Sequence, residues 1–578
     1  MALDLEAVKR RMDALAERSN WDAHWLECAE MFQPRKNDFT GLRTPGEKKG
    51  QLLLDGTPQH ALELFASGMH GMATNPATKW FALRMSDPEL QDHDGAKRWL
   101  SEIEARMWAK MYAPGAGLTN ALVEAYYDLG TFGTAVVYIG ERKNGGLLFQ
   151  TRHLAECYIA ENDEGVVDTV DRKTRMTVRQ VVQTWGEDDG GFMRPASTMS
   201  ENVHKLWADG KLDEEIEIGH SVFPREQRDL GSKLKRDMPY ASVYFEIEPL
   251  TRLEESGYPE FPYVCPRWTK RAGEVYGRSP GMTALPDAKM LQAMMRTLIM
   301  AAQKAADPPL FLPDDGFSGP IRTVPGALNY YRGQREIIPL PTPTSLPFEV
   351  ELIEQLRNRI RSVMFTDILQ IVTEREMTAY ETATRMQERM RLLGPALGRV
   401  EAEMLGPMVE RVFGIMDRAG ELPPAPEELD QKHFGVSFVS PISIAQRQTE
   451  AQALQMILQN AAPLLQIDPS AVIETFEPRR ILRHLADLFR LDPKLLTTEE
   501  EQAQVQQMKQ AQMATQMGVP AAKTAKDAAG AVNAVADAQQ KGLNLADIAG
   551  QVSRQAVMDP KLAALVRQGG EQMGMPTQ

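Results

Sequence analysis

The chain is 578 residues long, which is enough for roughly three or four domains of ordinary size. Its hydrophobic fraction of 43% and charged fraction of 25% are typical of a globular protein and exclude a disordered chain. The net charge of −14 excludes a protein that coats nucleic acid, because such proteins are basic overall. No apolar run is long enough to span a membrane, and acidic residues follow Met1 where a signal peptide would be basic. Three cysteines without a CxxC pair predict a reducing compartment and no disulfide framework.

Helices dominate the predicted start of the chain. Apolar residues at helical spacing predict three of them, at residues 3–31, 97–112 and 118–129. A further helical run follows the tetrapeptide Asp55-Gly56-Thr57-Pro58. Residues 134–139 are strand-like, end at Gly140 and are followed by the turn-rich Asn144-Gly145-Gly146, which predicts a β-hairpin. Short β-branched strands between polar turns are then expected from residue 166 to residue 263.

Two helices with a small β unit between them are predicted in the middle of the chain. The first covers residues 285–306 and stops at Asp307-Pro308-Pro309, and the second covers residues 348–365. The intervening stretch is dense in proline and glycine but has Phe311 and two tyrosines to bury. Three arginines, Arg357, Arg359 and Arg361, lie on the other faces of the second helix. A solvated helix face explains them as well as phosphate contact does.

One long helix is predicted from residue 377 to residue 420, because apolar residues recur there at steps of three or four. Gly394-Pro395 and Gly406-Pro407 lie inside it, and each proline removes a helical hydrogen bond, so the helix should bend there. Its periodicity fits a strut across an assembly and a core helix of a large domain equally well. Three or four helices are expected in residues 442–489, and no aromatic residue follows Phe489.

One motif suggests catalysis. Gly277-Arg278-Ser279-Pro280-Gly281 matches the G-x-S-x-G elbow of serine hydrolases, and His433 or His484 could follow as the base. Pro280 argues against this role, because the residue after the nucleophile should donate its backbone N–H to the oxyanion. A turn that enters the helix at Leu285 is the simpler interpretation. No Walker A loop occurs and no two histidines are three or four residues apart, so neither a motor ATPase nor a zinc site is expected.

The order of these segments resembles that of the portal proteins of tailed bacteriophages, most closely the head-to-tail connector family of short-tailed phages. The residues that carry the resemblance lie in four places: Asp55-Gly56-Thr57-Pro58, the run from Val275 to Gly281, Glu376-Met377-Thr378-Ala379-Tyr380-Glu381, and Leu392-Leu393-Gly394-Pro395. It covers roughly residues 1–500. Each motif is weak alone, and their order makes the set specific.

The resemblance implies a mainly helical α+β subunit of a ring. Its layout would be a wing at 1–284, a first stem helix at 285–306, a clip at 307–347, a second stem helix at 348–369, a tunnel loop at 370–379, a long kinked wing helix with its connection at 380–434, a crown at 435–498, and a Gln/Ala-rich tail at 499–578. The clip of the family meets the packaging motor and later the tail adaptors. An acidic wall suits such a channel, because it would let DNA move without holding it.

The function implied is that of a non-enzymatic ring of about twelve copies at one vertex of the phage head. Double-stranded DNA would pass through it during packaging and ejection. Its partners would be terminase, tail adaptors and the major capsid or scaffolding protein, with no membrane, metal or cofactor, and it would assemble in the host cytoplasm. We expect Glu374, Arg375 and Glu376 near the lumen, and Arg357, Arg359 and Arg361 on the stem at subunit contacts or facing DNA. The alternatives are a serine hydrolase built on Ser279 and another ring protein of the virion, such as a tail adaptor.

Overall fold

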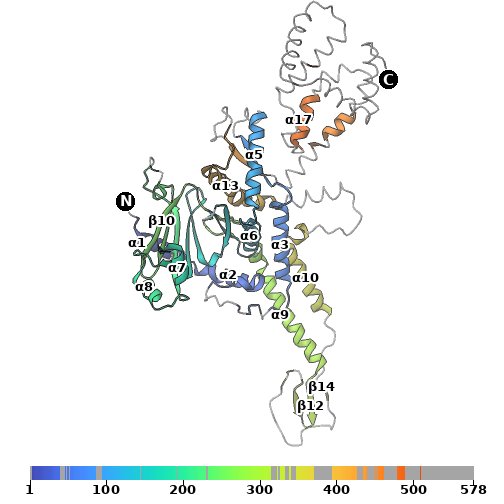
Figure 1. Cartoon of the computed structure of the whole chain (residues 1–578). Coiled ribbons are helices and arrows are strands. Elements are labelled where there is room, and N and C mark those ends of the chain that lie inside the picture. Colours follow the sequence, from blue (N-terminus) through green and yellow to red (C-terminus); the bar gives the residue numbers. More distant parts are fainter. Residues whose placement is uncertain are drawn as a thin grey trace, which may run out of the picture. The chain divides into compact units, whose positions relative to one another are not determined.

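A computed structural model describes most of the first 460 residues and a few short segments beyond them (Figure 1). The described residues are 3–39, 46, 48–50, 53–85, 94–142, 145–190, 192–229, 232, 234–313, 322, 324, 326–331, 338–339, 347–369, 393–425, 434–438, 450–451, 453–460, 478–488 and 508. The chain divides into two units, Met1–Leu495 and Leu496–Gln578. Only Met508 of the second unit is described, so every helix and strand with described bounds belongs to the first.

The N-terminal helix predicted at 3–31 is two helices, α1 (Leu5–Ala16) and α2 (Ser19–Phe32). The chain breaks at Arg18, whose side chain is only 4% exposed. Its guanidinium donates to the carbonyl oxygens of Leu154 and Cys157 at 2.8 and 2.6 Å and to the Tyr276 hydroxyl at 2.9 Å. The gain from these distant contacts outweighs the local preference for a continuous helix.

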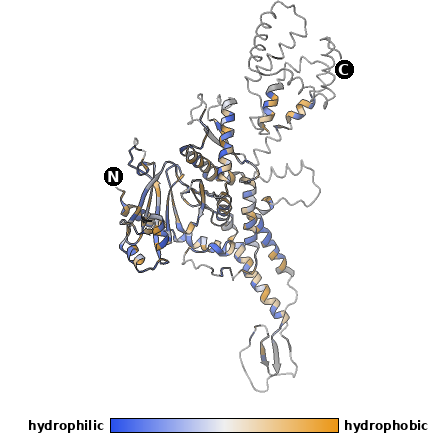
Figure 2. Cartoon of the chain, in the orientation of Figure 1, coloured by the Kyte–Doolittle hydropathy of each residue, from blue (hydrophilic) through white to orange (hydrophobic). Residues whose placement is uncertain are grey.

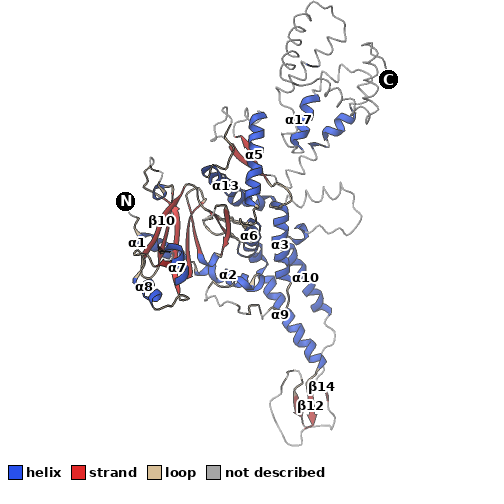
Figure 3. Cartoon of the chain, in the orientation of Figure 1, coloured by secondary structure: helices blue, strands red, loops and turns tan. Residues whose placement is uncertain are grey.

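A five-stranded antiparallel sheet follows, in the order β10-β9-β8-β5-β4. Its strands are β4 (Cys157–Glu161), β5 (Val167–Thr177), β8 (Glu215–Pro224), β9 (Tyr240–Glu246) and β10 (Thr251–Tyr258). Alternate residues of β9 face opposite sides, so Val243 and Phe245 pack against α1 while Tyr244 joins the cluster of α7 (Val178–Trp185) and α8 (Glu201–Ala208). Helices therefore cover both faces (Figure 3). The hairpin β6 (Glu187–Asp189) and β7 (Phe192–Arg194) lies between α7 and α8 in the chain.

A larger core surrounds a smaller sheet, β11-β2-β3. The hairpin predicted after residue 134 is confirmed as β2 (Val136–Glu141) and β3 (Leu147–Arg152), and β11 (Tyr263–Val264) pairs with β2. The helices of this core are α3 (Thr57–Ala73), α5 (Asp94–Met111) and α6 (Leu118–Phe132), close to the predicted ranges. A separate pair of strands joins β1 (Phe81–Met85) to β15 (Phe434–Phe438).

The two predicted middle helices and the β unit between them are confirmed. They are α9 (Pro280–Ala306), a three-stranded sheet, and α10 (Pro347–Val363), followed by the short α11 (Thr366–Leu369). The sheet has the order β13-β12-β14 and consists of β12 (Leu310–Pro313), β13 (Leu328–Tyr331) and β14 (Ile338–Pro339). α9 and α10 pack side by side (Figure 1). The first helix starts five residues earlier than expected, because Ser279 caps it and Pro280 fits its first turn.

The long helix predicted at 377–420 is described from residue 393. Residues 393–400 are α-helical, Glu401–Leu405 form a π-helical turn, and α13 (Gly406–Arg418) continues the helix. The irregularity lies immediately before Pro407, at one of the two points where a bend was predicted. Pro395, at the other predicted point, lies in the helical residues 393–400, and residues 391 and 392 of the turn before it are outside the described residues. Two further helical segments are described, residues 453–460 and α17 (Pro478–Leu488).

Candidate functional site: the base of the paired helices

The tetrapeptide that starts at Asp55 holds α9 and α10 together. Gln292 of α9 accepts the backbone N–H groups of Leu54 and Asp55 at 2.8 and 3.0 Å and donates to the Asp55 carbonyl at 2.7 Å. Arg357 of α10 donates from Nε and Nη2 to Asp55 Oδ2 at 3.0 and 2.8 Å. The second carboxylate oxygen accepts the backbone N–H of Thr57 at 2.8 Å, where α3 begins. One loop therefore fixes the start of α3 and contacts both long helices.

The electrostatics of Asp55 favour its ionised form. Its side chain is only 4% exposed, and this burial by itself would raise its pKa. Hydrogen bonds from Thr57 and the Arg357 guanidinium outweigh burial, so the pKa of Asp55 lies below its ordinary value. The pair is consequently charged at neutral pH.

The other two arginines of α10 are also paired within the chain. Arg359 Nη2 lies 3.2 Å from Asp287 Oδ2 of α9, and its side chain is 68% exposed. Arg361 Nη1 donates to Asn358 at 3.0 Å and to Glu354 at 3.4 Å on its own helix. The structure thus brings two of the three predicted residues into contact with neighbouring elements of their own chain. Glu374, Arg375 and Glu376 lie outside the described residues.

The hydrolase interpretation of Ser279 is wrong. Its hydroxyl is buried, accepts the backbone N–H of Met282 at 2.8 Å, and donates to the Thr131 carbonyl at 2.8 Å. Both bonds belong to a helix N-cap packed on the end of α6, and leave the oxygen unavailable as a nucleophile. Of the two candidate bases, His484 pairs with Glu450 at 3.0 Å, and His433 lies outside the described residues.

Glycines allow the backbone on each side of this cap to approach closely. Gly133 ends α6 with φ of +77°, and a Cβ on it would lie 2.5 to 2.6 Å from backbone atoms of residues 277–279. Gly277 in turn donates its N–H to Thr134 Oγ1 at 2.8 Å. The segment from Val275 to Gly281 is therefore a packing motif that holds the start of α9 against the end of α6.

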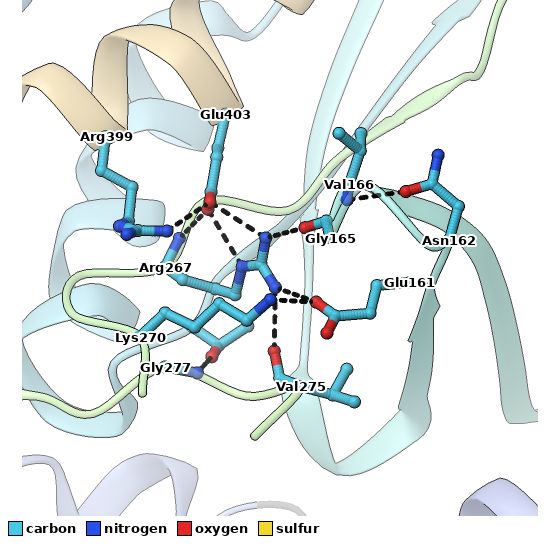
Figure 4. A network of polar contacts seen from close by, with 11 residues as sticks. Glu161, Asn162, Gly165, Val166, Arg267, Lys270, Val275, Gly277, Arg399 and Glu403 are labelled. Carbon is cyan, nitrogen blue, oxygen red and sulfur yellow. Dashed lines mark hydrogen bonds and ion pairs between the residues drawn. The ribbon is translucent and has the colours of Figure 1, made fainter. Parts of the chain in front are cut away.

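A buried ionic cluster lies next to the segment from Val275 to Gly281 and was missed by the sequence analysis (Figure 4). Arg267 is 2% exposed, and its guanidinium contacts Glu403 in the π-helical turn and Glu161 at the end of β4. Lys270 shares Glu161 at 2.6 Å, and Arg399 shares Glu403 at 2.9 Å. Burial lowers the pKa of Arg267, but its bonds to Glu403 and Glu161 raise that pKa overall. Only the neighbouring Gly406-Pro407 pair could have drawn attention to Glu403 in the sequence.

Most of these contacts join separate elements of the chain. In the described part of the chain, no group of three or more His, Cys, Asp or Glu side chains could hold a metal ion. Among the described residues no helix has both the length and the apolar character needed to cross a bilayer.

Comparison with known proteins places the chain in a family. The profile described as bacteriophage head to tail connecting protein matches residues 5–496. The chain belongs to this family. A probable portal protein of Bordetella phage BPP-1 is 31% identical over 91% of this chain and 95% of its own length. The portal protein of Salmonella phage epsilon15 is 29% identical over 88% and 92%.

The family membership confirms the resemblance to phage portal proteins that the four sequence motifs indicated. Among solved structures, a chain in the neck of an empty GTA particle aligns with a TM-score of 0.35 and 10% identity. That alignment covers 70% of this chain and 87% of the other.

Proposed function

We propose that the chain is the portal subunit of a tailed phage, and that a ring of about twelve copies occupies one vertex of the head. Double-stranded DNA passes through the ring during packaging and ejection. Relatives named as portal proteins align with about nine-tenths of the chain, which supports this role over that of a smaller tail adaptor. The role is structural, and the ATPase that drives packaging is a separate protein docked on the ring.

The helix pair supplies the wall of the channel in this proposal. α9 and α10 are the two stem helices, and the sheet β13-β12-β14 between them is the clip that meets terminase and later the tail adaptors. Residues 1–284 with the kinked helix form the wing, residues 370–379 the tunnel loop, and residues 435–498 the crown. The contacts of Asp55, Gln292 and Arg357 support this layout, because they fix both stem helices to the wing at one point.

An exposed face of α9 is the proposed contact between copies. Met290, Ala293, Thr297 and Met300 recur at steps of three and four, and all are exposed in the single chain. Met290 and Met300 are 48% and 47% exposed, and the Thr297 hydroxyl is satisfied within the helix by the Ala293 carbonyl. Apolar residues continue along the length of α9 (Figure 2). A next copy that covers this face would remove its apolar surface from water and repeat around a closed ring.

The arginines of α10 would make only weak contacts with DNA. Arg357 and Arg359 are already paired with Asp55 and Asp287, so their charge toward a passing phosphate is reduced. Arg361 has a partner on its own helix and is 42% exposed. Together with the net charge of −14, this pairing suits a channel through which DNA slides. The lumenal placement of Glu374, Arg375 and Glu376 belongs to the same proposal.

The observation that carries the proposal is the family match over residues 5–496, which includes both long helices and the sheet between them. Negative-stain electron microscopy of the purified full chain, with class averaging, tests it. The expected result is rings with a central hole wide enough for duplex DNA. Particles that form no ring, both alone and when coexpressed with the other head proteins, would contradict it.

A further inference from the structure

The π-helical turn at Glu401–Leu405, called the wide turn below, interrupts the kinked helix that runs from residue 393 through α13, and it has a local cause. The Gly406 backbone N–H donates to the carbonyl of Glu401, five residues back, instead of to the usual partner four residues back. Pro407 follows and has no N–H, and in an ordinary α-helix its ring would collide with the carbonyl of Glu403. One extra residue in the turn avoids this collision. Proline therefore permits the wide turn, although it does not specify which side chains face inward.

The extra residue changes the direction of every side chain before it. One residue of an α-helix corresponds to about 100° of rotation, so residues 393–400 are turned by this angle relative to an unbroken helix. The buried face of α13 could pack in the core whether or not the turn contains the extra residue. Met408 and Val409 are both buried, as are Ile415 and Met416, so the face is wide enough for two adjacent columns. On the other side of the turn, Leu393, Leu397 and Val400 are buried in a single column, so their packing also favours the observed register.

The Arg267–Glu403 contact distinguishes the two registers. Glu403 lies inside the wide turn, and its carboxylate accepts from the backbone N–H, Nε and Nη2 of Arg267 at 2.9, 3.1 and 2.9 Å. In the other register Glu403 would turn away by about 100°. The fully buried guanidinium of Arg267 would then keep Glu161 but lose these bonds to Glu403, and breaking part of a buried ionic cluster is costly.

We propose that the Arg267–Glu403 pair is a lock that selects the wide register of the kinked helix. The same guanidinium donates to Glu161 at 2.7 Å, to the Gly165 carbonyl at 2.8 Å and to the Val275 carbonyl at 3.1 Å (Figure 4). The Arg267 guanidinium therefore links the turn that contains Glu403 to the β4–β5 hairpin and to the segment that leads into α9. When the lock is lost and residue 407 permits an α-helical turn, residues 393–400 rotate about the helix axis.

Four variants of the full chain separate the lock from the proline. P407A is expected to keep the wide turn, because Glu403 still holds Arg267. The double variant E403A/P407A is expected to become α-helical. E401A/P407A is the matched control, because Glu401 lies in the same turn and is partly buried, but is not a partner of Arg267. E403Q/P407A preserves the size of the side chain and repeats the test if the truncated chain does not fold.

Spin labels on engineered cysteines at the exposed positions Gly398 and Arg271 report the rotation. The three native cysteines are buried and so are shielded from labelling. Pulsed electron paramagnetic resonance, with labelled chains diluted among unlabelled ones, measures the distance between labels. We expect the wild-type distance in P407A and E401A/P407A, and a shift in E403A/P407A and E403Q/P407A. A shift in the single variant P407A would overturn the proposal. The absence of a shift in E403A/P407A and in E403Q/P407A would overturn it as well.

Discussion

At the scale of single residues, Ser279 shows how a sequence motif can belong to structure alone. Its hydroxyl caps α9 and bonds to the end of α6, so we expect Ser279→Ala to lower the free energy of unfolding by about 1–2 kcal/mol. Urea unfolding measures this change. Thr283→Ala, at an exposed position in the same turn, is the control and should cost less than about 0.5 kcal/mol. Equal stability of S279A and T283A would contradict the capping role.

A substitution at Gly133 should be strongly destabilising, because backbone strain and a steric clash would add together there. An alanine would hold an unfavourable φ of +77° and would place its Cβ against the backbone of residues 277–279. We expect Gly133→Ala to cost about 3 kcal/mol or more. Gly273→Ala isolates the first penalty, because its φ is +82° and nothing lies within 4 Å of its Cβ position. That control should cost about 1 kcal/mol.

At the scale of elements, the Asp55–Arg357 pair tests whether the loop and α10 stabilise each other. A double-mutant cycle with Asp55→Asn and Arg357→Gln should give a coupling free energy of about 1–3 kcal/mol, because the Asp55 carboxylate is buried. Arg361→Gln is the control, because its partners lie on its own helix. A coupling of Asp55 with Arg361 as large as that with Arg357 would show that the pair has no special role.

The same pair predicts a dependence on pH. The folded pKa of Asp55 is depressed, so its contribution to stability is fully present above the unfolded pKa of about 3.9. The contribution is lost as the pH falls through the lower folded pKa. The stability difference between wild type and D55N, measured by urea unfolding, should therefore shrink below about pH 4. A difference that does not change with pH would contradict this assignment.

Periodicity predicted helices well and the contacts between them poorly. The apolar spacing placed α5, α6, α9 and α10 to within a few residues, because that signal is local. The break at Arg18 was missed, since its partners lie more than a hundred residues away. Arg357 was expected on the stem, but its partner Asp55 is 302 residues distant and no local pattern could reveal it. The contact of Glu403 with Arg267 was missed for the same reason, although the neighbouring Gly406-Pro407 pair correctly marked the irregular turn.

At the scale of the whole molecule, the exposed stripe on α9 should control assembly. Replacing Met290 and Met300 together by glutamate puts charge into the proposed contact between copies, where it would have to be desolvated. We expect loss of rings and a monomeric chain of unchanged helix content. Gln303→Glu is the control, because it lies about 100° around the helix from the centre of the stripe. Sedimentation velocity and circular dichroism measure the two properties, and rings that persist in M290E/M300E would contradict the contact.

A reconstruction of the assembled protein by electron cryomicroscopy tests the central claim most directly. It should show a closed ring with α9 and α10 of every copy around a channel wide enough for duplex DNA, and with the sheet β13-β12-β14 at one end of that wall. A closed ring whose channel is lined by other elements, or is too narrow for the duplex, would contradict the account.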